Sequence, residues 1–205
     1  MRVHWDHLFE DLEGQLASEW ESERAALDAE SERLRISRLT LRDRLRVLCS
    51  VGASTVIDVA SGGRVRVRLQ ALGADWIAAA MIEAEGVRRS PTTRIIPLSA
   101  IRSLGVDHGL LLASLDGADA DAAALRERMS LGFVLRDLAR RRIAVRVFRA
   151  DGSELQGTID RASADHLDLA LHDAGTARTI AAVRDFRVVP FAALESVQIV
   201  GDHVP

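Results

Sequence analysis

Alternating apolar and polar positions mark residues 143–199 as a series of short strands. Apolar side chains occupy every second position at 143–147 and 167–171, and they flank Gly157 at positions 155 and 159; Asp151-Gly152 separates the first two runs. Asp-Gly tolerates the positive φ angles of a tight turn, so the pattern predicts a β-hairpin there. Pro190 predicts a short helical turn before a last strand. The stretch therefore predicts a small all-β module.

The same module occurs earlier in the chain. Residues 94–104 match residues 187–197 position by position, and residues 62–81 align on residues 152–171 without a gap. A Leu-Arg-Asp triplet precedes each copy, beginning at Leu41 and at Leu135. Matching features in the same order predict a tandem duplication of a helix followed by a small barrel.

Residues 4–36 have the pattern of one long amphipathic helix. Apolar residues recur at spacings of three, four and seven, and the remaining surface is strongly acidic. The stripe either packs on the protein's own modules or forms a seam for self-association, as a coiled coil, or for a partner helix. A helix of this length would span about 50 Å, so we expect part of it to project or to pair with another subunit. The stripe residues considered for association are Trp5, Leu8, Phe9, Leu12, Leu16 and Trp20.

Two shorter helices are expected. One covers residues 39–48, and Gly52 is expected to terminate it. The other runs from Ala122 to Arg140, after a small acidic linker. Its expected inward positions are Leu125, Met129, Phe133 and Leu138. The expected segments are the acidic helix 1–37, a first barrel 38–106, the linker and helix start 107–130, and a second barrel 131–205.

Composition excludes several classes of chemistry. Cys49 is the single cysteine, so the chain can form neither an internal disulfide nor a thiolate metal cluster, and we expect the cytoplasm as its location. His166, Asp168 and His172 are expected on the solvated face of their strand. The chain has no phosphate-binding glycine loop and no serine elbow. We therefore expect no enzyme, no metal, no cofactor and no membrane association.

Arginines suggest one further type of partner. All 27 basic residues are arginines, and three of them alternate with apolar positions near the start of the first module. Such a stripe lines up positive charge on one face of a strand and could contact the phosphates of RNA or DNA. The candidate nucleic-acid contacts are Arg64, Arg66 and Arg68, with Arg88 and Arg89 in the next loop and Arg140, Arg141 and Arg142 at a helix end.

The two modules together resemble a known fold. Val145-Arg-Val147, Asp151-Gly152, Gly157 and the run from Asp165 to Leu169, closed by residues 189–197, are similar to the Sm-like fold and its bacterial host-factor branch. The resemblance implies a helix followed by a five-stranded, strongly bent barrel, and other SH3-like small barrels share much of this pattern. Members of the family form rings through strand edges and bind RNA. Here no Asn follows the aspartate of the third strand, so the resemblance favours assembly over RNA binding.

We therefore expect an α+β protein of two tandem five-stranded Sm-like or SH3-like barrels, each preceded by a helix, with a long acidic N-terminal helix. The expected function is non-catalytic: the chain self-associates as a homo-oligomer and recruits a protein partner through the N-terminal helix. The alternative is an RNA- or DNA-binding regulatory protein that uses the arginine stripe.

Overall fold

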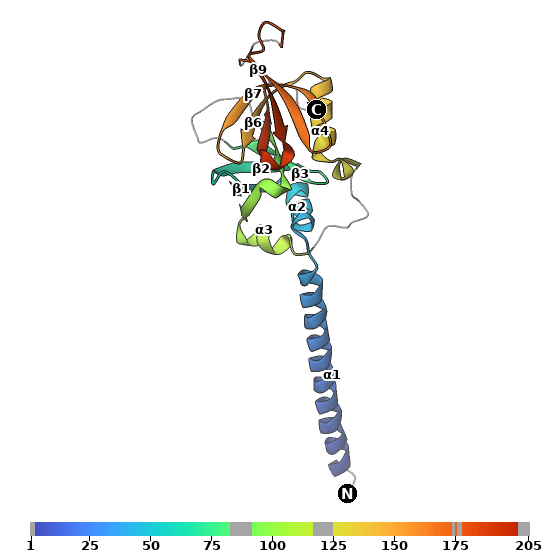
Figure 1. The fold of residues 1–205 in the computed structure, drawn as a ribbon. Helices are drawn as coiled ribbons and strands as arrows, with labels where there is room; N and C mark the ends of the chain where they lie inside the picture. Colours follow the sequence, from blue (N-terminus) through green and yellow to red (C-terminus); the bar gives the residue numbers. More distant parts are fainter. Residues whose placement is uncertain (1–2, 83–91, 117–124, 174, 176–177, 201–205) are drawn as a thin grey trace. The chain divides into compact units, whose positions relative to one another are not determined.

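A computed structural model describes residues 3–82, 92–116, 125–173, 175 and 178–200. The chain forms two compact units, residues 1–41 and 42–205. The first unit is built on the helix α1 (Val3–Ser37), which confirms the long helix expected from the spacing of its apolar residues. The second unit holds the sheet and the remaining helices (Figure 1).

In the described part of the chain, short helices and 3-10 turns precede, interrupt or follow two series of strands, ten strands in all; Figure 1 shows their arrangement. The helical elements are α2 (Leu41–Ser50), η1 (Leu98–Ala100), α3 (His108–Ala113), η3 (Leu125–Arg128), α4 (Leu131–Arg140) and η4 (Phe191–Ala193). The strands are β1 (Ser54–Val59), β2 (Arg64–Leu72), β3 (Trp76–Met81), β4 (Thr93–Pro97), β5 (Ile101–Gly105), β6 (Ala144–Arg149), β7 (Glu154–Ala162), β8 (His166–Leu171), β9 (Asp185–Pro190) and β10 (Leu194–Ile199).

All ten strands belong to one antiparallel sheet with the order β5-β1-β2-β3-β4-β10-β6-β7-β8-β9. The first half-sheet, β5-β1-β2-β3-β4, and the second half-sheet, β10-β6-β7-β8-β9, have the same internal order. The sheet is open, with β5 and β9 at its two edges. The α+β class is confirmed, whereas the two separate five-stranded barrels are not, because β4 of the first half pairs with β10 of the second.

Backbone details repeat between the halves. The hairpin glycines Gly62 and Gly152 have φ angles of 85° and 82°, as the turn pattern requires. After the helix of each half, Gly52 and Arg142 adopt φ angles of 60° and 56°. The predicted match of the two Leu-Arg-Asp triplets is wrong by one helical turn. The buried leucines set the true register, in which Leu45 and Leu48 correspond to Leu135 and Leu138.

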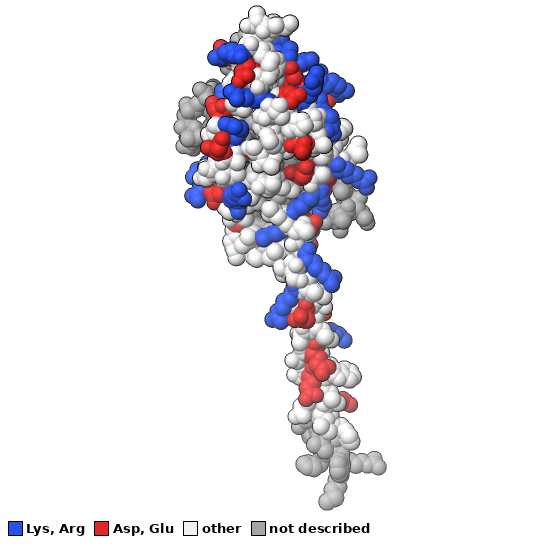
Figure 2. Space-filling view, viewed as in Figure 1, with Lys and Arg blue, Asp and Glu red and all other residues white. Residues whose placement is uncertain are grey.

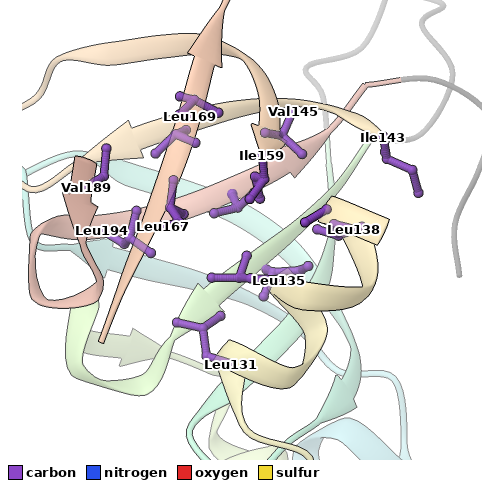
Figure 3. Packing of buried hydrophobic residues seen from close by; sticks show 14 of the residues in the cluster. Leu131, Leu135, Leu138, Ile143, Val145, Ile159, Leu167, Leu169, Val189 and Leu194 are labelled. Carbon is purple, nitrogen blue, oxygen red and sulfur yellow. The ribbon is translucent and has the colours of Figure 1, made fainter. Parts of the chain in front are cut away.

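Each half has its own apolar core. In the second half α4 packs on β7, and Leu131, Leu135 and Leu138 point toward strand residues such as Ile159 (Figure 3). In the first half α2 contributes Leu45 and Leu48 to a cluster with β-strand residues. The second cluster also includes Trp76 and Ile95, which belong to strands of the first half. Burial therefore ties the two half-sheets together in addition to strand pairing.

The helix expected from Ala122 to Arg140 is wrong in its extent. Ser130 accepts a hydrogen bond from the backbone N–H of Phe133 and caps a new helix, so η3 and α4 are separate elements. The inward positions change with this break, because Leu125 is 73% exposed and Phe133 is 50% exposed. Residues 117–124, which include the start of the expected helix, lie outside the described residues.

Candidate interaction surfaces

The junction between the half-sheets, here called the seam, is an antiparallel pairing of β4 with β10. Val197 lies opposite Ile95, and Gln198 lies opposite Arg94. Ile95 is only 2% exposed because it faces the core under α4. The seam thus combines backbone hydrogen bonding with burial of apolar side chains, the two contributions that make strand addition stable.

Polar side chains complete the opposite face of the seam. The guanidinium carbon of Arg94 lies 3.8 Å from the centroid of the Phe148 ring, a cation–π contact. The carboxylate of Glu195 accepts a hydrogen bond of 3.1 Å from the backbone N–H of Ser61, in the β1–β2 turn. Burial is the main cause that lowers the pKa of Arg94, and the nearby Glu195 carboxylate acts in the opposite direction.

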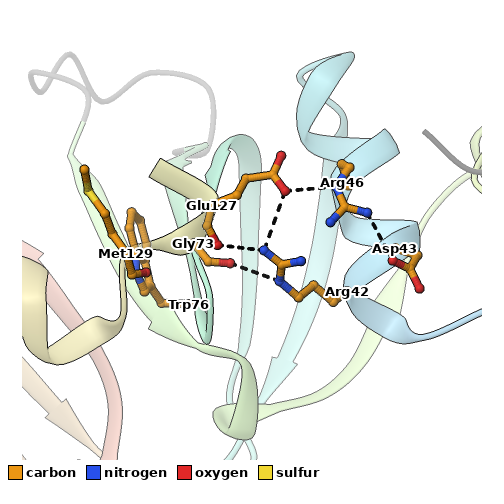
Figure 4. A network of polar contacts seen from close by, with 7 residues as sticks. All are labelled: Arg42, Asp43, Arg46, Gly73, Trp76, Glu127 and Met129. Atoms are coloured by element: carbon orange, nitrogen blue, oxygen red, sulfur yellow. Dashed lines mark hydrogen bonds and ion pairs between the residues drawn. The ribbon is translucent and has the colours of Figure 1, made fainter. Parts of the chain in front are cut away.

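A second set of contacts joins the segment before α4 to the first half (Figure 4). The Glu127 carboxylate accepts a hydrogen bond of 2.9 Å from Nε of Arg46 and lies 3.5 Å from Nη2 of Arg42. Hydrogen bonding to Glu127 is the main cause that raises the pKa of Arg46. The indole N–H of Trp76 donates to the carbonyl of Met129 at 2.9 Å. These contacts fix η3 against α2 and the β2–β3 turn.

The two edges of the sheet are the exposed counterparts of the seam strands. In the sequence repeat β5 corresponds to β10, and β9 corresponds to β4. Val188 of β9 occupies the position of Ile95 but is 69% exposed, and Phe186 beside it is 61% exposed. An exposed edge with apolar side chains is a template for adding another strand.

The long helix that carries the predicted association stripe is present, and the described part of the stripe is exposed. Trp20 is 69% exposed, and the side chains of Trp5 and Leu8 lie outside the described residues. Carboxylates lie on the described part of α1 in this view (Figure 2). The exposed stripe residues are Phe9, Leu12, Leu16, Trp20, Leu27 and Leu34.

The candidate nucleic-acid arginines lie in two places, on β2 and at the end of α4. On β2, Arg64, Arg66 and Arg68 alternate with inward apolar residues, as the pattern predicts. Carboxylates pair with most of these arginines: Arg64 with Asp58, both Arg140 and Arg141 with Asp137, and Arg142 with Asp160. Arg88 and Arg89 lie outside the described residues. Because four of the described candidate arginines already have acidic neighbours, fewer of them are available for phosphates.

Histidine chemistry differs from the prediction at one position. His172 was expected on a solvated face, but it is 3% exposed, because it follows the last residue of β8 and turns inward. Its Nε2 lies 2.9 Å from Oγ1 of Thr158, and its Nδ1 lies 3.0 Å from the carbonyl of Asp173, so both ring nitrogens have partners. Within the described residues, no group of three or more His, Cys, Asp or Glu side chains could hold a metal ion.

The single cysteine is a poor nucleophile. Cys49 packs beside the core of the first half, and burial raises the pKa of its thiol to about 12. At neutral pH the group is therefore a protonated thiol, whereas thiolate is the reactive form.

Among the described helices, none combines the length and the hydropathy that a membrane-spanning helix needs. Comparison with protein-family models, with curated proteins and with solved structures finds no match for this chain.

Proposed function

We propose that this chain is a non-catalytic assembly protein whose copies join head to tail, with β5 of one copy adding to β9 of the next. The observation that carries the proposal is the seam, where β10 adds to β4 inside one chain. Because β5 and β9 are the sequence repeats of β10 and β4, the chain contains an internal template for its own association.

The seam also supplies the register of the joint between copies. Val197 opposite Ile95 becomes Leu104 opposite Val188 when each residue is replaced by its repeat counterpart. Val188 would then be buried in the joint, as Ile95 is buried in the seam. In this proposal each half acts as one Sm-like small barrel, and strand addition extends the row of halves.

Charges at the two edges favour this arrangement. In the seam, Arg94 forms a cation–π contact with Phe148. In the repeat, Arg187 corresponds to Arg94 and Asp58 corresponds to Phe148, so the joint would place Arg187 of one copy beside Asp58 of the next. Likewise, the seam contact between Ser61 and Glu195 becomes Asp151 with Arg102. Both counterpart pairs place opposite charges across the joint. They would extend the ion pairs that Asp58 forms with Arg64, and Arg187 with Asp185, inside one chain, which favours this register over others.

The acidic helix α1 is the second association surface in the proposal. Its exposed apolar stripe suits self-association or a helical partner, since an apolar stripe on a helix is stabilised by burial against another surface.

The mass of the full chain in solution tests the proposal. Light scattering over a range of concentrations is expected to give species larger than one chain, and Asp58→Arg is expected to weaken them by placing two arginines together. The double variant Asp58→Arg with Arg187→Asp should recover association, because the pair is restored with reversed charges. A parent chain that stays monomeric at every concentration would exclude the proposal.

A further inference from the structure

A groove runs between α4 and the outer face of the first half-sheet, on the α4 side of the seam. It encloses about 570 Å³. Trp76, Ala78 and Ile95 line it from the sheet, and Met129, Phe133 and Val134 line it from the segment 129–134. Pockets of this size with mostly apolar walls are typical binding sites.

The lining of the groove suits large apolar side chains. Its floor contains the small residues Ala71 and Ala78, and Phe133 forms a wall while remaining 50% exposed. This phenyl ring lies half in water beside an apolar depression, so a partner that covers it is stabilised by the burial of apolar surface.

The rim of the groove is basic. Arg126, Arg141 and Asp137 line it; Asp137 pairs with Arg141, whereas Arg126 forms no ion pair with another described residue and supplies the excess positive charge. Six arginines lie in the segment 125–142, and its two acids, Glu127 and Asp137, already pair with arginines. The expected occupant is therefore apolar on one side and acidic along its flanks.

Residues 9–23 of α1 have this chemistry. Phe9, Leu12, Leu16 and Trp20 form one exposed stripe at helical spacing. Six acids and no basic residue occur in the same stretch. Glu13 and Glu19 flank the stripe on the helical projection, and Glu23 ends it one turn after Trp20. The arginine-rich rim and these carboxylates are complementary.

We propose that the groove binds residues 9–23 of α1 from a second copy of this chain. Each copy offers one helix and one groove, so two copies can exchange helices symmetrically. This contact uses surfaces separate from β5 and β9, so it holds or fails independently of the edge pairing.

The test uses full chains that carry Val188→Asp, which removes edge pairing and leaves only the helix–groove contact. Sedimentation velocity is expected to show that this chain still forms dimers. Adding Trp20→Asp or Phe133→Asp is expected to weaken dimerisation by at least about a hundredfold, because the symmetric dimer loses a buried aromatic side chain at each of its two contacts. Circular dichroism checks that both variants fold, and Arg126→Glu serves as a second groove variant that leaves the core intact. Leu27→Asp, outside the stretch, is the matched control in α1.

Mixing distinguishes a contact between copies from other arrangements. The Trp20→Asp chain keeps an intact groove, and the Phe133→Asp chain keeps an intact helix, so their equimolar mixture should form heterodimers with one of the two contacts. A mixture that stays monomeric overturns the proposal. Dimers that survive both Phe133→Asp and Arg126→Glu also overturn it, since helices paired with each other would not need the groove. A Val188→Asp chain that is monomeric overturns it as well.

Discussion

Val188→Asp is the sharpest test of strand addition at the sheet edge. In the single chain Val188 is 69% exposed, so the change should leave the stability of the monomer almost unaltered. In the proposed joint the residue takes the position of Ile95, which is 2% exposed. The variant therefore separates association from folding.

The size of the effect follows from these two exposures. Full burial of a valine side chain contributes about 1.5–3 kcal/mol, so the two thirds that would leave water contribute about 1–2 kcal/mol. An unpaired carboxylate at the buried position adds a desolvation cost of roughly 2 kcal/mol. Together these predict that the association constant of the joint falls by at least about a hundredfold.

Analytical ultracentrifugation across a concentration series measures this change, with thermal unfolding of the same samples as the check on folding. Ile180→Asp is the matched control, because Ile180 is 95% exposed and lies outside the strands. If the Val188→Asp chain and the parent chain form the same species with equal association constants, the reasoning from the seam is refuted.

Three further predictions concern the folded chain. Glu127→Gln should lower the free energy of unfolding in urea by about 2 kcal/mol, because the Arg46 side chain, 13% exposed, loses the carboxylate bound to its Nε and keeps only Asp43 as an anionic partner. Glu30→Gln, in the exposed pair with Arg33, should change it by less than about 0.5 kcal/mol. Gly157→Ala should cost roughly 2–3 kcal/mol, since the new Cβ would lie 2.0 Å from the carbonyl oxygen of Ala170, whereas Gly14→Ala, in open space on α1, should not destabilise; equal urea midpoints for the two glycine variants would contradict this. Cys49 should react slowly with a disulfide reagent at pH 8 and rapidly once the chain is unfolded, because the pKa of its thiol in the folded chain is about 12; a fast folded-state reaction would disprove its burial.

The strands of this fold were predictable because they depend on local pattern. Alternation located the β2 arginines on the outer face, and Asp151-Gly152 located a hairpin turn. The helical turn after Pro190 was predictable for the same reason. Each of these features is decided by neighbours within a few residues.

The predictions fail where contacts between distant parts of the chain determine the structure. Apolar spacing alone favoured one helix through Ser130, but that hydroxyl caps α4, and the backbone N–H of Leu131 also donates to Asp75 in the other half. Likewise, His172 turns inward because Thr158 of β7 offers a partner. The pairing of β4 with β10 depends on contacts about a hundred residues apart, which periodicity does not encode.

The covalent link between the halves gives the seam a property that no joint between copies can share. Its two strands are held at a high effective concentration at any dilution, whereas a joint between chains obeys mass action. Its partners Arg94 and Phe148 include only one charge, so high salt should spare it while it screens Arg187 from Asp58. Dilution or salt would then dissociate an assembly into pairs of halves and never into single halves, and any closed assembly would contain an even number of them.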